Sequence, residues 1–344
     1  MKERSRRPRS CPHQTPEIWK ARLLEVKARF HYGPKKLRSI LMREYPGTGV
    51  PAASTLGKIL SKEGLVCRRR IHRKWPRQPL VEHALATAPN QVWAIDFKGW
   101  FRTADGARCD PLTVSDLHSR YVLCCRLVRS QSFREVQPVL LEIFRRYGLP
   151  EHLRSDNGAP FGSNGAGGLS RLSIWLLRLG IKPEFIEPSH PEQNGIHERM
   201  HRNLKAWIET PSADWPSQQQ ALERWRLEYN NQRPHEALGQ RLPSEVYFHS
   251  SRALGPSKPL VYPSGHCVRR VEPGGRINWM HKRFFIGKAF AHQPLGLKTI
   301  EPKRCQVYFS TRLLGQLYFD PLCRGLVPCK QVDQTKNLSP MCSV

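Results

Sequence analysis

The sequence predicts a multidomain chain with an all-α head, a mixed α/β core and a small C-terminal β module. Apolar residues recur at helical spacing near the N-terminus, and strand-like alternation begins near residue 91. Short alternating runs separated by glycine follow residue 256. At 344 residues, of which 39% are hydrophobic, the chain is long enough for two or three domains with at least one sizeable core.

The charge is strongly positive and unevenly distributed. The chain has 56 Lys and Arg against 28 Asp and Glu, a net charge of +28. Residues 1–90 alone contain 21 Lys and Arg and 6 Asp and Glu, so more than half of the excess lies in the first quarter. Such a surface attracts polyanions, most often nucleic acid. The composition therefore favours a nucleic-acid-binding protein with a dedicated N-terminal head; the alternative is a basic protein with solvated charged faces.

Secretory, membrane and structural-zinc classes receive no support from the sequence. The basic start "MKERSRRPRS" is not followed by an apolar segment, and no apolar run approaches the roughly 18–20 residues of a membrane span. The ten cysteines lack paired spacing; Cys323 and Cys329 come nearest to a metal pattern, without a second pair close by. We expect a cytoplasmic, nucleoid-associated protein with reduced thiols and no membrane partner.

The head, residues 1–75, is predicted to contain three short helices. Apolar residues at helical spacing mark them at residues 19–30, 37–45 and 56–60, and "PGTGVPAAS" separates the last two. This pattern favours a helix-turn-helix DNA-binding head, with a small bundle that does not contact DNA as the alternative. The side chains expected to face DNA are Ser54, Thr55, Lys58 and Lys62 of the third helix and Arg68, Arg69 and Arg70 of the basic run after it.

A basic and polar linker at residues 76–90 leads into the predicted core, residues 91–248. Strands are expected at "QVWAIDFKGW", "DPLTVSDL", "RYVLCCRLV", "EHLRS" and "KPEFIE". Helices are expected at "SFREVQPVLLEIFRRYG", at "LSRLSIWLLRLG" and from about Ile196 onward. The order βββαβαβα predicts a mixed five-stranded sheet with helices on both faces. This is the element order of the ribonuclease-H-like fold.

Three acidic residues occupy positions in this order that can converge. Asp96 lies centrally on the first strand beside the apolar "VWAI", where an unpaired charge is costly. Asp156 ends the fourth strand, which neighbours the first in such sheets, and Glu198 lies on the helix after the fifth strand. Phosphodiester chemistry with two metal ions needs acidic oxygens around ions about 3.5–4 Å apart, and Mg²⁺ takes oxygen ligands. We predict Asp96, Asp156 and Glu198 as catalytic residues and as ligands of two Mg²⁺ or Mn²⁺ ions.

Each of these acids has a structural alternative, and other acids compete with them. Taken alone, Asp156 in "DNG" is typical of a turn, and Glu198 of a solvated helix face. We interpret Asp116 as the cap of the turn to Arg120. The remaining competitors are interpreted as solvated residues beside the Gly106 turn (Asp105 and Asp110) or as residues of the last strand and its loop (Glu184, Glu187 and Glu192).

Five motifs, in order between Val92 and Tyr247, resemble insertion-sequence transposases that share the retroviral-integrase core. They are "WAIDF", "TVSDLHSRYVL", "RSDNGAPF", "GIKPEFIEPSHPEQNGIHERMHRNLK" and "YNNQRPHEALGQRLPSEVY". The resemblance implies a ribonuclease-H-like core with a DDE triad at Asp96, Asp156 and Glu198, and it matches the bacterial branch with a helix-turn-helix head. The last two acids are separated by 41 residues, more than is usual in the family. The excess falls on the glycine-rich "GSNGAGGLSRL", where a loop insertion costs little.

The same resemblance implies DNA contacts on the helix that carries Glu198. Arg199 follows it directly, and Arg202 and Lys205 recur on its face; a solvated face is the alternative. The family core also matches here at Tyr229, Asn230, Arg233, Pro234 and His235, with packing roles for the tyrosine and the proline.

The C-terminal residues 249–344 resemble the SH3-like tails of these transposases. We expect a small β-barrel that contacts DNA or another subunit. Its phosphate-binding candidates are Arg269, Arg270, Lys282, Arg283, Lys303 and Arg304.

These observations predict a DDE transposase. It would bind the terminal inverted repeats of its element, cleave 3′ ends with metal ions and transfer the strands into target double-stranded DNA, as a homodimer or larger assembly. The alternatives are a catalytically inactive or domesticated transposase-derived repressor, and a nuclease of the same fold without strand transfer.

Overall fold

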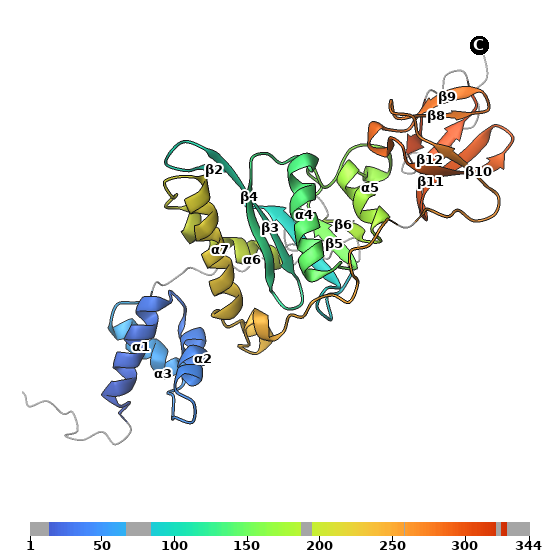
Figure 1. Cartoon of the computed structure of the whole chain (residues 1–344). Coiled ribbons are helices and arrows are strands. Elements are labelled where there is room, and N and C mark those ends of the chain that lie inside the picture. The colour runs from blue at the N-terminus through green and yellow to red at the C-terminus, as the bar shows by residue number, and fades with distance from the viewer. Residues whose placement is uncertain (1–13, 67–83, 187–194, 258, 321–324, 329–344) are drawn as a thin grey trace, which may run out of the picture. The chain divides into compact units, whose positions relative to one another are not determined.

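The computed structural model describes residues 14–66, 84–186, 195–257, 259–320 and 325–328 (Figure 1). The described residues divide into two compact units. One unit contains residues 14–66 and 227–246, and the other contains residues 84–226 and the described part of 247–328. The division falls within one helix, α7, Trp215–Asn231.

The first unit is helical. Its helices α1, Glu17–Arg29, α2, Pro34–Glu44, and α3, Ala53–Lys62, lie where the apolar spacing predicts them. They share a core of buried aliphatic side chains that includes Leu23, Leu41 and Leu56. Residues 227–246 add two short 3-10 turns, Glu236–Leu238 and Pro243–Glu245. Arg43 of α2 binds Glu245 of this segment at 2.5 Å, and the Tyr32 hydroxyl bonds Glu228 at 3.1 Å.

The second unit is built on the predicted mixed sheet. Its strands are β1, Val92–Phe97, β2, Phe101–Arg102, β3, Arg108–Asp116, β4, Val122–Val128, β5, His152–Ser155, and β6, Lys182–Phe185. β3 pairs antiparallel with both β1 and β4, whereas β5 lies parallel to both β1 and β6. β2 adds a short sixth strand, paired with the start of β3, to the five that were predicted.

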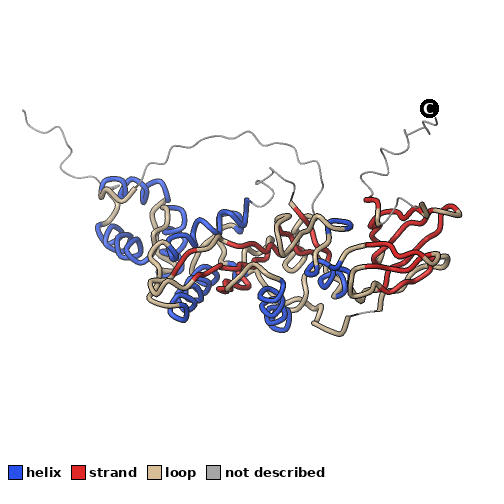
Figure 2. Tube along the Cα trace, turned by 90° about the horizontal axis from the view of Figure 1, so that it is seen from above, coloured by secondary structure: helices blue, strands red, loops and turns tan. Residues whose placement is uncertain are grey.

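Helices cover both faces of this sheet (Figure 2). They are α4, Phe133–Tyr147, α5, Arg171–Arg178, α6, Gly195–Ile208, and the first part of α7, with a 3-10 turn at Ala166–Gly168. Trp93 and Ile95 of β1 pack with α4 and α5, because alternate strand residues point to one face. Thr113 and Ser115 of β3 point to the other face, toward α6. In the part of the chain described, no helix is long and apolar enough to span a bilayer.

The C-terminal region is β-structure, as predicted, in two sheets. The larger has the order β13-β12-β11-β10-β7, and the smaller pairs β8 with β9. The strands are β7, His266–Arg270, β8, Arg276–Trp279, β9, Lys282–Phe285, β10, Pro294–Glu301, β11, Arg304–Phe309, β12, Arg312–Tyr318, and β13, Val327–Pro328, with a 3-10 turn at Lys288–Phe290. The described strands of the larger sheet end at β7 and β13 without closing on each other, so the predicted barrel is not formed as one closed sheet. The two sheets enclose an apolar core that includes Phe284, Leu297 and Phe309.

Candidate active site

Asp96 is the carboxylate around which the candidate site is built. It follows four fully buried residues of β1, and its side chain is 23% exposed. Burial, as the largest cause, and the carboxylates of Asp156 and Glu198 together raise its pKa to about 7, whereas the backbone N–H of Phe97 and the charge of Lys98 act in the opposite sense. The three acids selected from the sequence therefore lie close enough to interact electrostatically, and Asp96 has the most to gain from a bound cation.

Asp156 reaches this region because β5 runs parallel to β1. Ala94 pairs with Arg154, so continuing each strand by two residues puts Asp96 level with Asp156. The Oδ1 atom of Asp156 also accepts the Gly158 N–H at 3.0 Å, and the Asn157 side chain donates to the carbonyl of Ile186 at 2.6 Å. The turn interpretation of "DNG" is therefore correct as geometry. It does not compete with a site role, because a carboxylate offers about four lone-pair positions.

Glu198 lies in the first turn of α6, where it is exposed. The DNA-contact candidates Arg199, Arg202 and Lys205 are exposed on the same helix. Met200, His201 and Leu204, which lie between them in sequence, are buried. The helix thus turns one face to the core and leaves Glu198 and the three basic residues accessible.

A buried polar network, which the sequence analysis missed, lies beneath the acids. The Thr113 hydroxyl is 2.8 Å from Nε2 of both His197 and His201, and it donates to the backbone carbonyl of Asp96 at 3.1 Å. Ser115 Oγ is 3.0 Å from Nδ1 of His197. Burial lowers the pKa of His197 well below its usual value and that of His201 to about 3, so both imidazoles are neutral at physiological pH.

The signal for this network was present in the sequence as "HERMH". Histidines four residues apart share one helix face, and the same H-E-x-x-H spacing occurs in zinc hydrolases, where both imidazoles bind the metal. Asp96, His197 and His201 do offer ligand atoms within 4.8 Å of one another. However, Thr113 Oγ1 occupies the point where the two Nε2 atoms converge, which argues against a zinc-hydrolase centre.

Asp116 is the cap that the sequence predicted. Its side chain is fully buried, Oδ1 accepts bonds from the N–H and the hydroxyl of Ser119 at 2.7 and 2.6 Å, and Oδ2 accepts the N–H of Asn90 at 2.7 Å. Burial is the largest influence on its pKa and raises it, against these hydrogen bonds. Asp116 therefore stabilises the β3–β4 turn.

The prediction that Asp110 is solvated is wrong. Its side chain is fully buried, where Arg108 and Gln131 bind its two oxygens at 2.9 and 3.1 Å. Because β3 begins two residues earlier than predicted, Asp110 lies inside the strand and not at its first residue, next to the turn. Asp105 is exposed, as expected.

The remaining candidate residues lie on β6, on α3 or outside the described residues. Glu184 on β6 accepts hydrogen bonds from the Arg154 guanidinium at 3.1 and 3.0 Å, so its charge is paired with an arginine of β5. On α3, Ser54, Lys58 and Lys62 are exposed and Thr55 is half-buried. Arg68, Arg69, Arg70, Glu187, Glu192, Cys323 and Cys329 lie outside the described residues.

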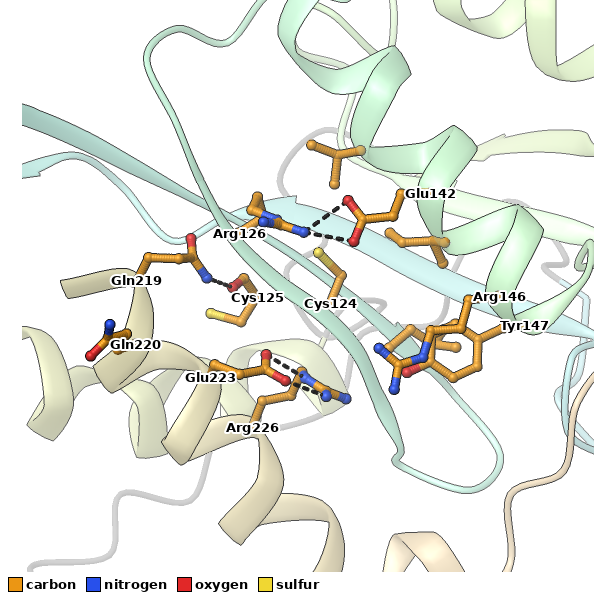
Figure 3. A pocket seen from close by; sticks show the side chains of 13 residues that line it. Cys124, Cys125, Arg126, Glu142, Arg146, Tyr147, Gln219, Gln220, Glu223 and Arg226 are labelled. Carbon is orange, nitrogen blue, oxygen red and sulfur yellow. Dashed lines mark hydrogen bonds and ion pairs between the residues drawn. The ribbon is translucent and has the colours of Figure 1, made fainter. Parts of the chain in front are cut away.

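A separate cavity of about 290 Å³ lies between β4, α4 and the first part of α7 (Figure 3). Four of its charged residues form ion pairs, Arg126 with Glu142 at 2.7 Å and Arg226 with Glu223 at 2.5 Å. Burial raises the pKa of the Cys124 thiol to about 12, so this thiol is not a nucleophile. The cavity contains none of the predicted site residues.

Comparison with known proteins identifies the class. Residues 86–191 and 179–243 match family descriptions of the integrase core domain. A 31.7 kDa protein of insertion element IS407 from Burkholderia multivorans is 30% identical over 239 residues, covering 68% of this chain and 82% of that protein. A 39.2 kDa protein of insertion element IS476 from Xanthomonas euvesicatoria is 28% identical over 248 residues, covering 69% of this chain and 67% of that protein. The BIV integrase catalytic core domain is 23% identical over 46% of this chain and 93% of that domain, with a TM-score of 0.36.

The chain belongs to the insertion-element transposases that contain an integrase core of ribonuclease-H-like fold. The resemblance inferred from the five motifs is thereby confirmed. The class of reaction in this family is polynucleotidyl transfer.

Proposed function

We propose that this protein is a transposase that binds the terminal inverted repeats of its element, cleaves the 3′ ends and joins them to target DNA. One observation supports this above the others. The carboxylates of Asp156 and Glu198 both act on a partly buried Asp96 whose pKa is raised to about 7. Such an arrangement is unfavourable by itself and becomes favourable when divalent cations bind to it.

We propose Asp96, Asp156 and Glu198 as the ligands and catalytic residues, and two Mg²⁺ or Mn²⁺ ions as the cofactors. When bound, the ions supply Lewis acidity for the attacking and the leaving oxygen. The protein's part is to hold Asp96 on β1, Asp156 directly after the parallel neighbour β5 and Glu198 on α6. The exposed Arg199, Arg202 and Lys205 on the same helix can bind DNA phosphates next to the acids.

The N-terminal and C-terminal regions of the chain would bind DNA. The helices α1–α3 are proposed as a helix-turn-helix head for the inverted repeats, with α3 as the recognition helix. The C-terminal sheets are proposed as an SH3-like module that binds DNA or another subunit. Because both element ends must be handled together, the active form is expected to be a homodimer or larger assembly on nucleoid DNA.

A strand-transfer assay with the flanking element ends tests the proposal. Wild type is expected to produce joined product with Mg²⁺ or Mn²⁺ and none with EDTA. Asp96→Asn, Asp156→Asn and Glu198→Gln should each reduce product by at least 10²-fold while retaining DNA binding, because each variant removes a charged ligand. Asp105→Asn, at an exposed acid of the β2–β3 turn, is the matched control and should retain activity.

The outcome separates this function from its alternatives. Product that is equal in wild type and Asp96→Asn would exclude the proposed site. Wild-type DNA binding without any product would favour a transposase-derived repressor. Cut ends that never join a target would favour a nuclease.

A further inference from the structure

His201 lies one helical turn after Glu198, and its two ring nitrogens face different groups. Nε2 is 2.8 Å from Thr113 Oγ1, whereas Nδ1 is 3.9 Å from Oδ2 of Asp96. The imidazole is 11% exposed. Among the described residues, Nδ1 has no partner within hydrogen-bond distance, so its role is not explained by packing.

The Thr113 hydroxyl decides which nitrogen of His201 carries the hydrogen. A hydroxyl has one hydrogen to donate and two lone pairs to accept with. The Asp96 carbonyl, 3.1 Å away, can only accept, so Thr113 donates to it and accepts an N–H from each imidazole. His201 is then the Nε2–H tautomer. Its Nδ1 presents a bare lone pair to the Asp96 carboxylate.

A lone pair and an ionised carboxylate in this position repel each other unless a cation or a donating water lies between them. The separation of 3.9 Å exceeds a direct hydrogen bond. A water that donates to both atoms at about 2.8 Å, at its tetrahedral angle, would hold them about 4.6 Å apart. Two ligands of one ion at about 2.0–2.2 Å lie about 3.3–3.6 Å apart at a tetrahedral angle and at most about 4.4 Å apart. The observed spacing lies between the tetrahedral values for an ion and for a water, and it is within the reach of a shared metal ion.

We propose that His201 Nδ1 and the Asp96 carboxylate bind the same divalent ion, and that this nitrogen ligand makes the site prefer Mn²⁺ over Mg²⁺. The inference rests on the proposed function, since it places one of the proposed ions. Imidazole favours first-row transition metals, whereas Mg²⁺ favours oxygen ligands and ordered water. Thr113 serves as the group to which a ligating histidine donates its other N–H.

His197 is excluded as a ligand by its hydrogen bonds. Ser115 and Thr113 bind its two nitrogens at 3.0 and 2.8 Å, and the residue is fully buried. A metal ion at His197 would have to break one of these bonds. His197 is therefore a support of the network and provides a matched control on the same helix face.

The test uses the full-length protein, stripped of metal and loaded with one equivalent of Mn²⁺. Electron spin-echo spectroscopy should detect coupling to an imidazole ¹⁴N in wild type. His201→Gln keeps an amide able to reach Thr113 and removes Nδ1, so the ¹⁴N coupling should disappear. Titration calorimetry of this variant should show Mn²⁺ Kd weakened at least tenfold and Mg²⁺ Kd changed less than twofold. His197→Gln should keep both the coupling and the Mn²⁺ Kd.

The failures of this inference and of the proposed function are distinguishable. Absence of ¹⁴N coupling in Mn²⁺-loaded wild type, or loss of the coupling in His197→Gln but not in His201→Gln, would overturn the role of His201. Strand transfer would survive either result. If Asp96→Asn leaves the affinity for both ions unchanged, the proposed metal site itself is wrong. Circular dichroism tests whether each variant is folded. If His201→Gln is unfolded, the ¹⁴N coupling in wild type and in His197→Gln still shows whether an imidazole other than His197 binds the ion.

Discussion

Asp96 is held in an environment that disfavours its charge when no metal is present. Burial and the neighbouring Asp156 and Glu198 carboxylates raise its pKa to about 7, from an ordinary value of 3.8. The folded protein thus retains a proton that the unfolded chain loses. This part of the stability is fully present below about pH 4 and is lost as pH rises through about 7.

A pH series in EDTA tests this account of Asp96. Between pH 5 and 8, the Tm of wild type should fall relative to that of Asp96→Asn, because only wild type must ionise this buried acid. The histidines contribute the opposite slope, since their lowered pKa values favour folding as pH rises, but they are present in both proteins and cancel. Parallel curves for the two proteins would contradict the raised pKa.

Thr113 joins both imidazoles and the β1 backbone through one hydroxyl. Thr113→Val keeps the shape and removes this atom, which leaves two buried imidazole N–H groups without an acceptor. We expect a loss of about 2–4 kcal/mol in the free energy of unfolding, measured by urea denaturation. Ser115→Ala removes only the bond to His197 and should cost about 1–2 kcal/mol. Equal stability of Thr113→Val and wild type would show that the network contributes little.

At the scale of elements, two acids on β3 differ from the candidate acids in the way their charge is satisfied. Asp110 is bound by Arg108 and Gln131, and Asp116 by backbone and hydroxyl donors of the β3–β4 turn and by Asn90. Protein groups satisfy these two acids. Asp96 instead lies near the carboxylates of Asp156 and Glu198. Within one sheet, a structural carboxylate therefore has protein donors as partners, whereas the candidate catalytic carboxylate has other acids as neighbours.

If Asp116 has a structural role only, its substitution should lower the stability of the protein without changing metal binding. Asp116→Ala should cost about 2–4 kcal/mol in unfolding free energy, because three buried donors lose their acceptor. Its Mn²⁺ affinity at a temperature where it is folded should match that of wild type. Asp96→Asn should show the reverse pattern. Weakened Mn²⁺ binding in a folded Asp116→Ala protein would reopen a metal role for this residue.

At the scale of the whole molecule, a net charge of +28 makes non-specific attraction to DNA a large part of any binding. Each phosphate contact contributes about 0.9 to the slope of log K against log salt. Arg202→Ala on the exposed face of α6 should lower this slope by about 1 for any DNA sequence. Arg126→Gln is the control, because Glu142 already pairs with that guanidinium at 2.7 Å. An unchanged slope in Arg202→Ala would remove this residue from the DNA interface.

Much of the fold could be predicted from the sequence. The spacing of apolar residues indicates whether a segment is a strand or a helix, because each element turns one face to the core. This spacing can be read from short stretches such as "QVWAIDF" and "SFREVQPVLLEIF". The order of these elements then predicts the mixed sheet. The β2 strand was not predicted because two residues are too few to show an alternating pattern. The burial of Asp110 was not predicted because one of its partners, Gln131, is distant in the sequence.

The sequence by itself determined the class of protein, the element order of the core and the choice of Asp96, Asp156 and Glu198. These depend on residue type and on spacing along the chain, and both can be read from the sequence. Only the tertiary structure decided which donors Asp116 binds, that Asp110 is buried, and that His201 directs a nitrogen at Asp96. Each of these depends on which donors and acceptors meet across strands and helices, because a side chain's role is fixed by its partners in space.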